Sequence, residues 1–207
     1  MNSLNELIES MIFSGVLKSP KIIDAFKIID RKYFIPKEHL DKTYIDAPLP
    51  IGKDQTISQP STVAFMLELL NPNVGDKVLD IGSGSGWTTA LLCQIVGDSG
   101  SVIGVERVDE LVQKGSYNLS KFKFLKNCKI QKADQQLGIT GETFDKILVS
   151  ASADKVPNEL FKQLKTGGTL VIPIKNSIFK FIKTTNDEIK VQEFPGFVFV
   201  PLITNSQ

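Results

Sequence analysis

The sequence predicts an α/β fold with a mostly parallel sheet and helices on both faces. Strand-like hydrophobic segments alternate with segments of helical periodicity from Val78 to Pro173, as in sheets whose strands are joined by helices. One of these strands runs into a glycine-rich turn that opens directly onto a helix. With 207 residues, 42% of them hydrophobic, the chain is long enough for one sizeable core. We therefore expect a single domain over 1–207.

Two amphipathic helices are expected at the N-terminus. Apolar residues recur at helical spacing before Gly15, namely Leu4, Leu7, Ile8, Met11 and Ile12. Ser19 and Pro20 then predict the N-cap and first turn of a second helix.

Residues 30–60 are expected to form an ordered loop. Its four prolines exclude a long helix, yet the segment is hydrophobic and aromatic, and long ordered loops in compact domains are usually functional. Ser58 lies where the N-cap of the next helix is expected, because Pro60 and an apolar periodic run follow it. Capping and catalysis are compatible, since free N–H groups at a helix N-terminus can bind a carboxylate.

The glycine turn follows the strand around Asp80 and has the spacing Gly82-x-Gly84-x-Gly86. Glycines allow a ligand to approach the backbone closely. The spacing differs from the G-x-G-x-x-G of dinucleotide sites, and an acidic residue before it suits a cationic ligand better than a pyrophosphate. The alternative is a glycine-rich turn that only closes a βα unit.

Glu106 ends the next strand-like segment, 20 residues after Gly86. An acidic residue at this position can bind a ribose diol. The alternative is a solvated carboxylate in a loop.

The remaining elements follow from periodicity and turn residues. Asp109 is expected to cap a helix that extends through Leu119. Further segments are predicted as follows: strands at 128–133, 144–149, 169–173, 178–184 and 197–203, a turn at Asn186-Asp187, and a helix that Pro157 starts and Gly167-Gly168 close.

Composition limits the function. A net charge of +1 gives no basic footprint for nucleic acid, and no apolar run is long enough to span a bilayer. Cys93 and Cys128 have no metal-ligand spacing and are expected to be buried reduced thiols. We expect a cytoplasmic monomer that binds no metal, nucleic acid or membrane.

Several separated motifs resemble known families. The glycine turn with Asp80 resembles motif I of the class I S-adenosylmethionine-dependent methyltransferases. Three preceding motifs resemble those of the protein-L-isoaspartate O-methyltransferases: Arg31-x-x-Phe34-x-Pro36, Tyr44-x-Asp46-x-Pro48-Leu49-Pro50-Ile51-Gly52 and Gln55-Thr56-Ile57-Ser58-x-Pro60. The resemblance covers roughly Leu7 to Pro173 and is weaker at Phe199–Leu202.

This resemblance implies a Rossmann-like sheet with an antiparallel last strand and two extra N-terminal helices. It divides the domain into N-terminal helices and substrate loop (1–60), cofactor-binding core (61–175) and C-terminal strands (176–207). The implied reaction transfers a methyl group from S-adenosylmethionine to the α-carboxylate of L-isoaspartyl residues, which repairs damaged proteins. Isoaspartyl-containing proteins and peptides are the implied partners, recognised by the loop from Tyr44 to Gln59.

The resemblance also implies the site residues. Ser58 is the catalytic residue. Cofactor-binding residues are Gln55, Thr56, Ile57, Asp80, Gly82, Ser83, Gly84, Gly86, Glu106, Arg107, Asp134 and Gln135, with Asp134 assigned to the adenine amino group. The chain departs from the family at Ala133-Asp134-Gln135, where Gly-Asp-Gly is usual, and at Val198, where many bacterial members have arginine. Gln135 with a positive φ would cost about 1 kcal/mol, so we expect a different backbone there.

Two other functions remain open at this point. A methyltransferase for another small acceptor would share the glycine turn, Glu106 and Asp134, but would not need the Thr-Ile-Ser stretch. A cofactor-binding module without turnover would fit the departures at Ala133 and Gln135.

Overall fold

The computed structural model describes residues 3–203. Its strands are β1 (Leu49–Gly52), β2 (Gln55–Ile57), β3 (Lys77–Ile81), β4 (Ser101–Glu106), β5 (Cys128–Lys132), β6 (Phe144–Val149), β7 (Leu164–Ile174), β8 (Ser177–Lys183) and β9 (Ile189–Pro195). Its helices are α1 (Leu4–Phe13), α2 (Pro20–Ile28), α3 (Pro60–Leu70), α4 (Trp87–Val96), α5 (Asp109–Ser120) and α6 (Asn158–Lys162), with short 3-10 helices η1 (Arg31–Phe34) and η2 (Lys37–Lys42). The outer limits of the domain expected over 1–207 lie outside the described residues.

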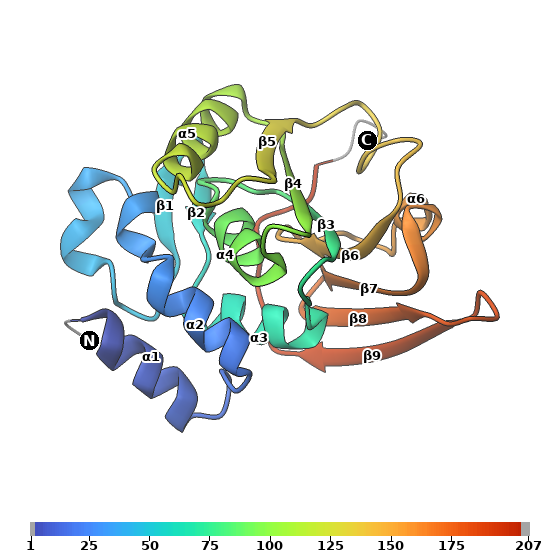
Figure 1. Cartoon of the computed structure of the whole chain (residues 1–207), viewed down its shortest axis with the longest axis horizontal. Helices are drawn as coiled ribbons and strands as arrows, with labels where there is room; N and C mark the ends of the chain where they lie inside the picture. Colours follow the sequence, from blue (N-terminus) through green and yellow to red (C-terminus); the bar gives the residue numbers. More distant parts are fainter. Residues whose placement is uncertain (1–2, 204–207) are drawn as a thin grey trace.

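The main sheet has the strand order β5-β4-β3-β6-β7-β8-β9, and β1 and β2 form a separate hairpin (Figure 1). Neighbouring strands from β5 to β7 are parallel, whereas β8 runs antiparallel to β7 and β9 antiparallel to β8. The α/β fold with a mostly parallel sheet and a reversal at its C-terminal edge is therefore confirmed.

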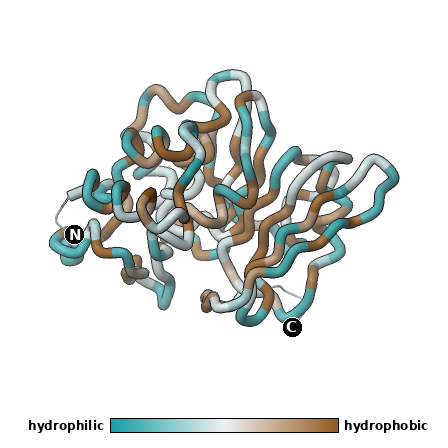
Figure 2. Tube along the Cα trace, turned by 90° about the horizontal axis from the view of Figure 1, so that it is seen from below, coloured by the Kyte–Doolittle hydropathy of each residue, from teal (hydrophilic) through white to brown (hydrophobic). Residues whose placement is uncertain are grey.

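Each face of the sheet has its own hydrophobic core, because successive strand residues point to opposite sides. Val78 and Leu148 belong to the larger cluster, with residues of α1 to α5. Leu79 and Ile147 belong to the smaller cluster, with Leu160 of α6. Hydrophobic segments run through the sheet in Figure 2, while the turns are mostly hydrophilic. Helices cover both faces, but unevenly, since β5 passes to β6 without a helix.

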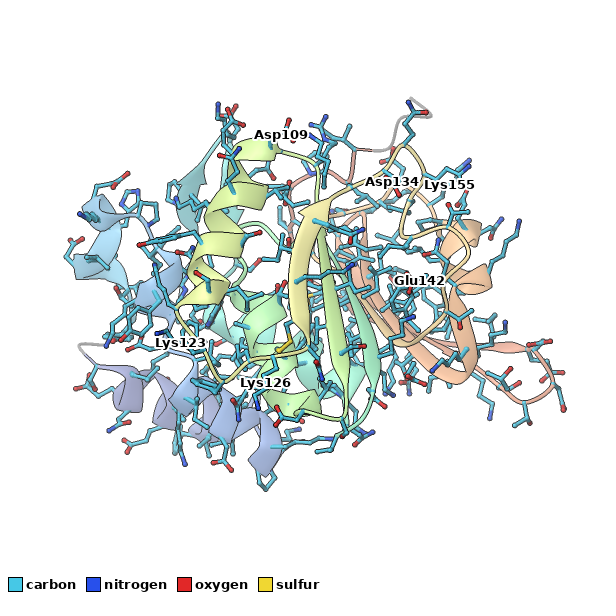
Figure 3. The ribbon with its side chains drawn as sticks, turned by 45° about the horizontal axis from the view of Figure 1, so that its top comes forward. Asp109, Lys123, Lys126, Asp134, Glu142 and Lys155 are labelled. Carbon is cyan, nitrogen blue, oxygen red and sulfur yellow. A yellow bond between two sulfur atoms is a disulfide. The ribbon has the colours of Figure 1, made fainter. Side chains whose placement is uncertain are left out.

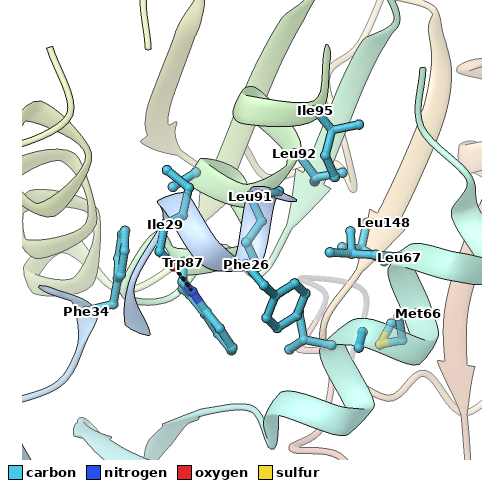
Figure 4. Packing of buried hydrophobic residues seen from close by; sticks show 14 of the residues in the cluster. Phe26, Ile29, Phe34, Met66, Leu67, Trp87, Leu91, Leu92, Ile95 and Leu148 are labelled. Atoms are coloured by element: carbon cyan, nitrogen blue, oxygen red, sulfur yellow. Dashed lines mark hydrogen bonds between the residues drawn. The ribbon is translucent and has the colours of Figure 1, made fainter. Parts of the chain in front are cut away.

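The N-terminal helices attach to the rest of the fold through the helix layer. Phe26 of α2 packs edge-on against Trp87 at the start of α4, with ring centroids 5.6 Å apart (Figure 4). The Trp87 indole N–H donates to the backbone oxygen of Ile29 at 3.3 Å. The two extra N-terminal helices are thus confirmed, and α2 lies against α3 and α4.

Two of the three predicted helix N-caps are wrong, and the third is confirmed. Gln59 rather than Ser58 is the N-cap of α3, and the amide of Ser61 in its first turn donates to a carboxylate oxygen of Asp46 at 2.8 Å. Ser19 is the N-cap of α2 with Pro20 in the first turn, as predicted, although its side chain makes no capping bond and its hydroxyl donates to Glu68 at 2.6 Å. Asp109 is the first residue of α5, not its cap. At α3, a side chain distant in sequence therefore replaces the local capping bond.

Two boundaries near the C-terminus also differ from expectation. Helix α6 ends at Lys162, and Gly167-Gly168 lie inside β7, because the chain begins to bond to β6 at Gln163, whose backbone oxygen accepts from the Phe144 amide at 2.8 Å. The segment 197–203 is not a strand and makes a single bridge, between Ser152 and Pro201. The last strand is instead the polar β9, which pairs only with β8.

The expectation of two reduced cysteines is wrong in the structure. Cys93 of α4 and Cys128 of β5 form a disulfide, with Cα atoms 6.1 Å apart. The spacing of the two cysteines carries no signal for this bond, because α4 and β5 meet through the tertiary packing of α4 on the sheet. No helix among residues 3–203 is long and apolar enough to cross a membrane.

Candidate active site

The carboxyl ends of β3, β4 and β5 form one wall of a cavity of about 390 Å³. The parallel register brings these ends together, with Ile81 beside Val105 and Glu106 beside Lys132. The cavity is lined by Gln55, Ile81, Gly82, Val105, Glu106, Arg107, Val108, Lys132, Ala133, Asp134, Gln135, Gln136, Leu137, Gly138, Ala151, Pro201, Leu202 and Ile203. Crevices at strand carboxyl ends are where open α/β sheets bind ligands.

The glycine turn connects β3 to α4 beside this cavity. The amides of Gly82 and Ser83 both donate to the Val105 backbone oxygen, at 2.9 and 3.2 Å. Gly82, Gly84 and Gly86 have φ values of +79°, +52° and +90°, which favour glycine at all three positions.

Gly82 and Gly86 have different roles in the turn. Gly82 lines both cavities of the site. Gly86 lines neither, and a Cβ there would lie 2.9 Å from Ile130 and 3.0 Å from the Gly115 backbone oxygen. Its glycine character therefore serves the packing of α4 against α5 and β5.

Glu106 is buried at the end of β4, with 7% of its surface exposed. One carboxylate oxygen accepts from the Gly84 amide at 3.0 Å and the other from the Val108 amide at 2.9 Å. A carboxylate offers about four acceptor sites, so each oxygen retains capacity for a further donor. This arrangement has the acceptor capacity to bind two adjacent hydroxyl groups.

Asp80 lies behind the glycine turn rather than in a cavity wall. Its side chain is fully buried, and Oδ2 accepts from the hydroxyls of Thr88 and Thr89 at 2.7 and 2.6 Å. Burial raises the pKa of this carboxyl to about 6, against the two threonine bonds, and Glu106 adds to the increase. Asp80 Oδ1 and the Ser83 hydroxyl are buried without a hydrogen-bond partner in the described part of the chain.

Asp134 and Gln135 line the larger cavity, just beyond the end of β5. Figure 3 shows Asp134 at the same edge of the sheet as Asp109 at the start of α5. Gln135 is not among the residues with positive φ, so the chain adopts a different backbone here, as expected. Both side chains are exposed and line the cavity.

A second, smaller cavity of about 50 Å³ contains Ser58. Thr56, Ile57, Ser83 and Gly84 also line it. The two cavities share Gln55, Gly82, Glu106 and Ala151 in their walls. They are therefore neighbours across the glycine turn, as a donor and an acceptor must be for a group transfer.

Most sequence-predicted site residues line one of these cavities. Arg107 joins the wall of the larger one, and Asp80 and Gly86 lie outside both. Sequence reasoning missed the tail, where Pro201, Leu202 and Ile203 line the larger cavity and Val200 the smaller. The only signal for the tail was the weak resemblance at Phe199–Leu202.

The residues present fit S-adenosylmethionine. A cavity of about 390 Å³ is within the size of small-molecule sites, about 300–1,000 Å³. Glu106 has acceptor capacity for a ribose diol, Asp134 offers an acceptor in the cavity wall, and the buried Asp80 carboxylate provides negative charge behind the turn. No cluster of His, Cys, Asp and Glu suited to a metal ion occurs among residues 3–203.

Comparison with known proteins agrees with this geometry. Residues 2–207 match the family model of protein-L-isoaspartate(D-aspartate) O-methyltransferase. The protein-L-isoaspartate O-methyltransferase of Methanopyrus kandleri is 40% identical over 202 residues, covering 95% of this chain and 89% of the relative. That of Fervidobacterium nodosum is 39% identical and covers 95% of this chain and 99% of the relative.

Solved structures show the same relation. A Plasmodium falciparum chain, described as a protein-L-isoaspartate O-methyltransferase in complex with S-adenosyl-L-homocysteine, superposes with a TM-score of 0.88. It is 28% identical and covers 99% of this chain and 100% of its own. On the strength of the whole-chain match and these relatives, the chain belongs to the protein-L-isoaspartate(D-aspartate) O-methyltransferase family of S-adenosylmethionine-dependent enzymes.

Proposed function

We propose that this chain transfers a methyl group from S-adenosylmethionine to the α-carboxylate of L-isoaspartyl residues in damaged proteins and peptides. The observation that carries the proposal is the small cavity at Ser58, which adjoins the larger cavity along Gln55, Gly82, Glu106 and Ala151. The family match and the names of the relatives support the choice of acceptor.

In the proposed arrangement the larger cavity holds the nucleoside. Glu106 accepts from the ribose hydroxyls, and Asp134 with Gln135 contacts the adenine. Gln55, Thr56, Ile57, Gly82, Ser83, Gly84 and Arg107 complete the binding surface, with Asp80 and Gly86 supporting the turn from behind. S-adenosylmethionine supplies a methyl group bonded to a positively charged sulfur, which transfers in line to an acceptor oxygen.

The acceptor needs no general base. A free carboxylate has a pKa of about 3 to 4 and is already ionised at neutral pH. Consistent with this, the small cavity is lined without histidine, lysine or cysteine. The Ser58 hydroxyl has no hydrogen-bond partner among residues 3–203, so it is available to donate to the acceptor carboxylate and orient it. Catalysis then comes mainly from positioning.

The acceptor carboxylate does not bind at the first turn of α3, because the side chain of Asp46 already occupies that position. Asp46 already bonds the Ser61 amide at 2.8 Å and receives the Gln59 side-chain amide at 3.1 Å. We therefore assign acceptor binding to Ser58 and to the surface of the loop from Tyr44 to Gln59.

We also propose that the chain works as a cytoplasmic monomer, as one domain, on protein substrates without nucleic acid. A net charge of +1 supports this partner choice, because proteins that bind nucleic acid without sequence preference carry a basic footprint. Sedimentation of the purified chain, alone and with RNA, tests the monomeric state and the absence of RNA binding.

The deciding experiment measures methyl transfer from labelled S-adenosylmethionine to an isoaspartyl peptide, with the aspartyl isomer as control. We expect labelling of the isoaspartyl peptide only, and a loss of about 100-fold in kcat for Ser58→Ala. Ser120→Ala, at the exposed end of α5, is the matched serine control and is expected to retain full activity. Equal labelling of both peptides would point to another acceptor, and cofactor binding without any labelling to a module without turnover.

A further inference from the structure

Arg31 is a completely buried arginine at the start of η1. Its Nη1 donates to the backbone oxygens of Thr43 and Ile45 at 3.0 and 3.2 Å. Its Nη2 donates to those of Ala47 and Ser58 at 2.9 and 3.0 Å. One side chain thus bonds four carbonyls of the loop that leads to the small cavity, and one of them belongs to Ser58 itself.

The guanidinium stays charged although no carboxylate among residues 3–203 bonds to it. Burial lowers the pKa of Arg31 to about 10, and the nearby charge of Asp46 opposes this decrease. At neutral pH the group is therefore a cation, and its carbon lies 5.4 Å from the centre of the Trp87 ring. Hydrogen bonds from a charged donor are stronger than neutral ones, so the four carbonyls are held firmly.

The side chain of Asp46 links the same loop to the start of α3. Its carboxylate accepts from the amide and hydroxyl of Ser61, at 2.8 and 2.5 Å, and from the side chain of Gln59 at 3.1 Å. Arg31 therefore holds the backbone oxygen of Ser58, and Asp46 holds the residues that follow it at the start of α3. Neither Arg31 nor Asp46 lines either of the two cavities described above.

We propose that Arg31 is a positioning residue for Ser58, whose backbone it fixes so that the serine hydroxyl faces the small cavity. The inference rests on the proposed function and extends it, because it assigns the orientation of Ser58 to a side chain that does not touch the substrate. Misplacement of a reacting group by about 1 Å can cost about 100-fold in rate.

The test compares two variants. Arg31→Lys keeps the charge but has one nitrogen, so it cannot donate to both pairs of carbonyls. Glu68→Ala is the matched control, because it removes three hydrogen bonds, from Lys18 and Ser19, at the other end of α3. We expect both variants to have a lower Tm and unchanged affinity for S-adenosyl-L-homocysteine. Only Arg31→Lys should lose kcat, by about 100-fold, with a small change in KM.

Equal kcat values in Arg31→Lys and Glu68→Ala, counted per cofactor-binding molecule, would overturn the proposal. Should Arg31→Lys fail to fold, Asp46→Asn is measured instead, because it weakens the hydrogen bonds that link the loop to the start of α3. This variant must then lower kcat in the same way. Amide hydrogen exchange over residues 55–61 needs no activity and is expected to be faster in Arg31→Lys than in Glu68→Ala. Failure of the wild type to methylate the isoaspartyl peptide would refute the proposed function. Unchanged amide hydrogen exchange in Arg31→Lys would refute the role of Arg31.

Discussion

We predict that ionisation of the buried Asp80 carboxyl lowers the stability of the folded protein at neutral pH. Its pKa is raised from 3.8 to about 6 in the folded state, chiefly by burial. At a pH between these two pKa values, the folded protein binds more protons at Asp80 than the unfolded chain does. Its stability therefore falls as pH rises through this window, and the full loss is present at neutral pH.

The gap between the two pKa values corresponds to about 3 kcal/mol. Asp80→Asn removes the charge and keeps an oxygen that can accept from Thr88 and Thr89. The new amide group is buried where Oδ1 now lacks a partner, which costs about 1 kcal/mol or more. We expect a net gain of about 1–2 kcal/mol in the unfolding free energy of the ligand-free protein at neutral pH.

Urea unfolding of wild type and Asp80→Asn from about pH 4 to 7 measures this effect. The wild-type unfolding free energy should fall relative to that of the variant as pH rises. Calorimetry should show that Asp80→Asn weakens binding of the cationic S-adenosylmethionine more than that of uncharged-sulfur S-adenosyl-L-homocysteine. Parallel stability curves over the whole pH range would refute the assignment of this cost to a buried charge.

Three further predictions concern the glycine turn, the ribose site and the disulfide. Gly86→Ala should lower the unfolding free energy by about 2–4 kcal/mol in urea titrations, because strain at positive φ adds to a steric clash. Gly141→Ala, with φ +82° and no atom within 4 Å of the new Cβ, should cost only about 1 kcal/mol, and equal losses would contradict the clash. Glu106→Gln should weaken S-adenosyl-L-homocysteine binding by about 10- to 100-fold in calorimetry, and unchanged affinity would remove Glu106 from the site. Reduction of Cys93–Cys128, which are 35 residues apart, should lower stability by about 3–4 kcal/mol, while a Cys93→Ser/Cys128→Ser variant should not respond to reductant.

Much of the sheet and the nucleoside side of the site could be predicted from the sequence. The strand–glycine turn–helix pattern and the position of Glu106 are local features, and the structure confirms the elements around them at β3, α4 and β4. Hydrophobic periodicity and turn residues report such local order because each depends on the residue's near neighbours in the chain.

Local capping was the weakest prediction. Ser58 has the right residue type before a proline, yet Gln59 is the N-cap of α3 and Asp46 accepts from the Ser61 amide in its first turn. Asp109 is expected to cap α5, but Val108 is the N-cap. N-cap preferences describe an isolated helix end, and a carboxylate from a distant segment overrides them when the fold brings it close.

The sequence by itself determined the alternation of strands and helices, the glycine turn and the acidic residues at the strand ends. Only the tertiary structure decided that Arg31 reaches four carbonyls of the loop, that Cys93 meets Cys128, and that the tail lines both cavities. The physical reason is that these contacts join segments far apart in the chain. No periodicity or spacing encodes them, because they exist only once the sheet and its helices have packed.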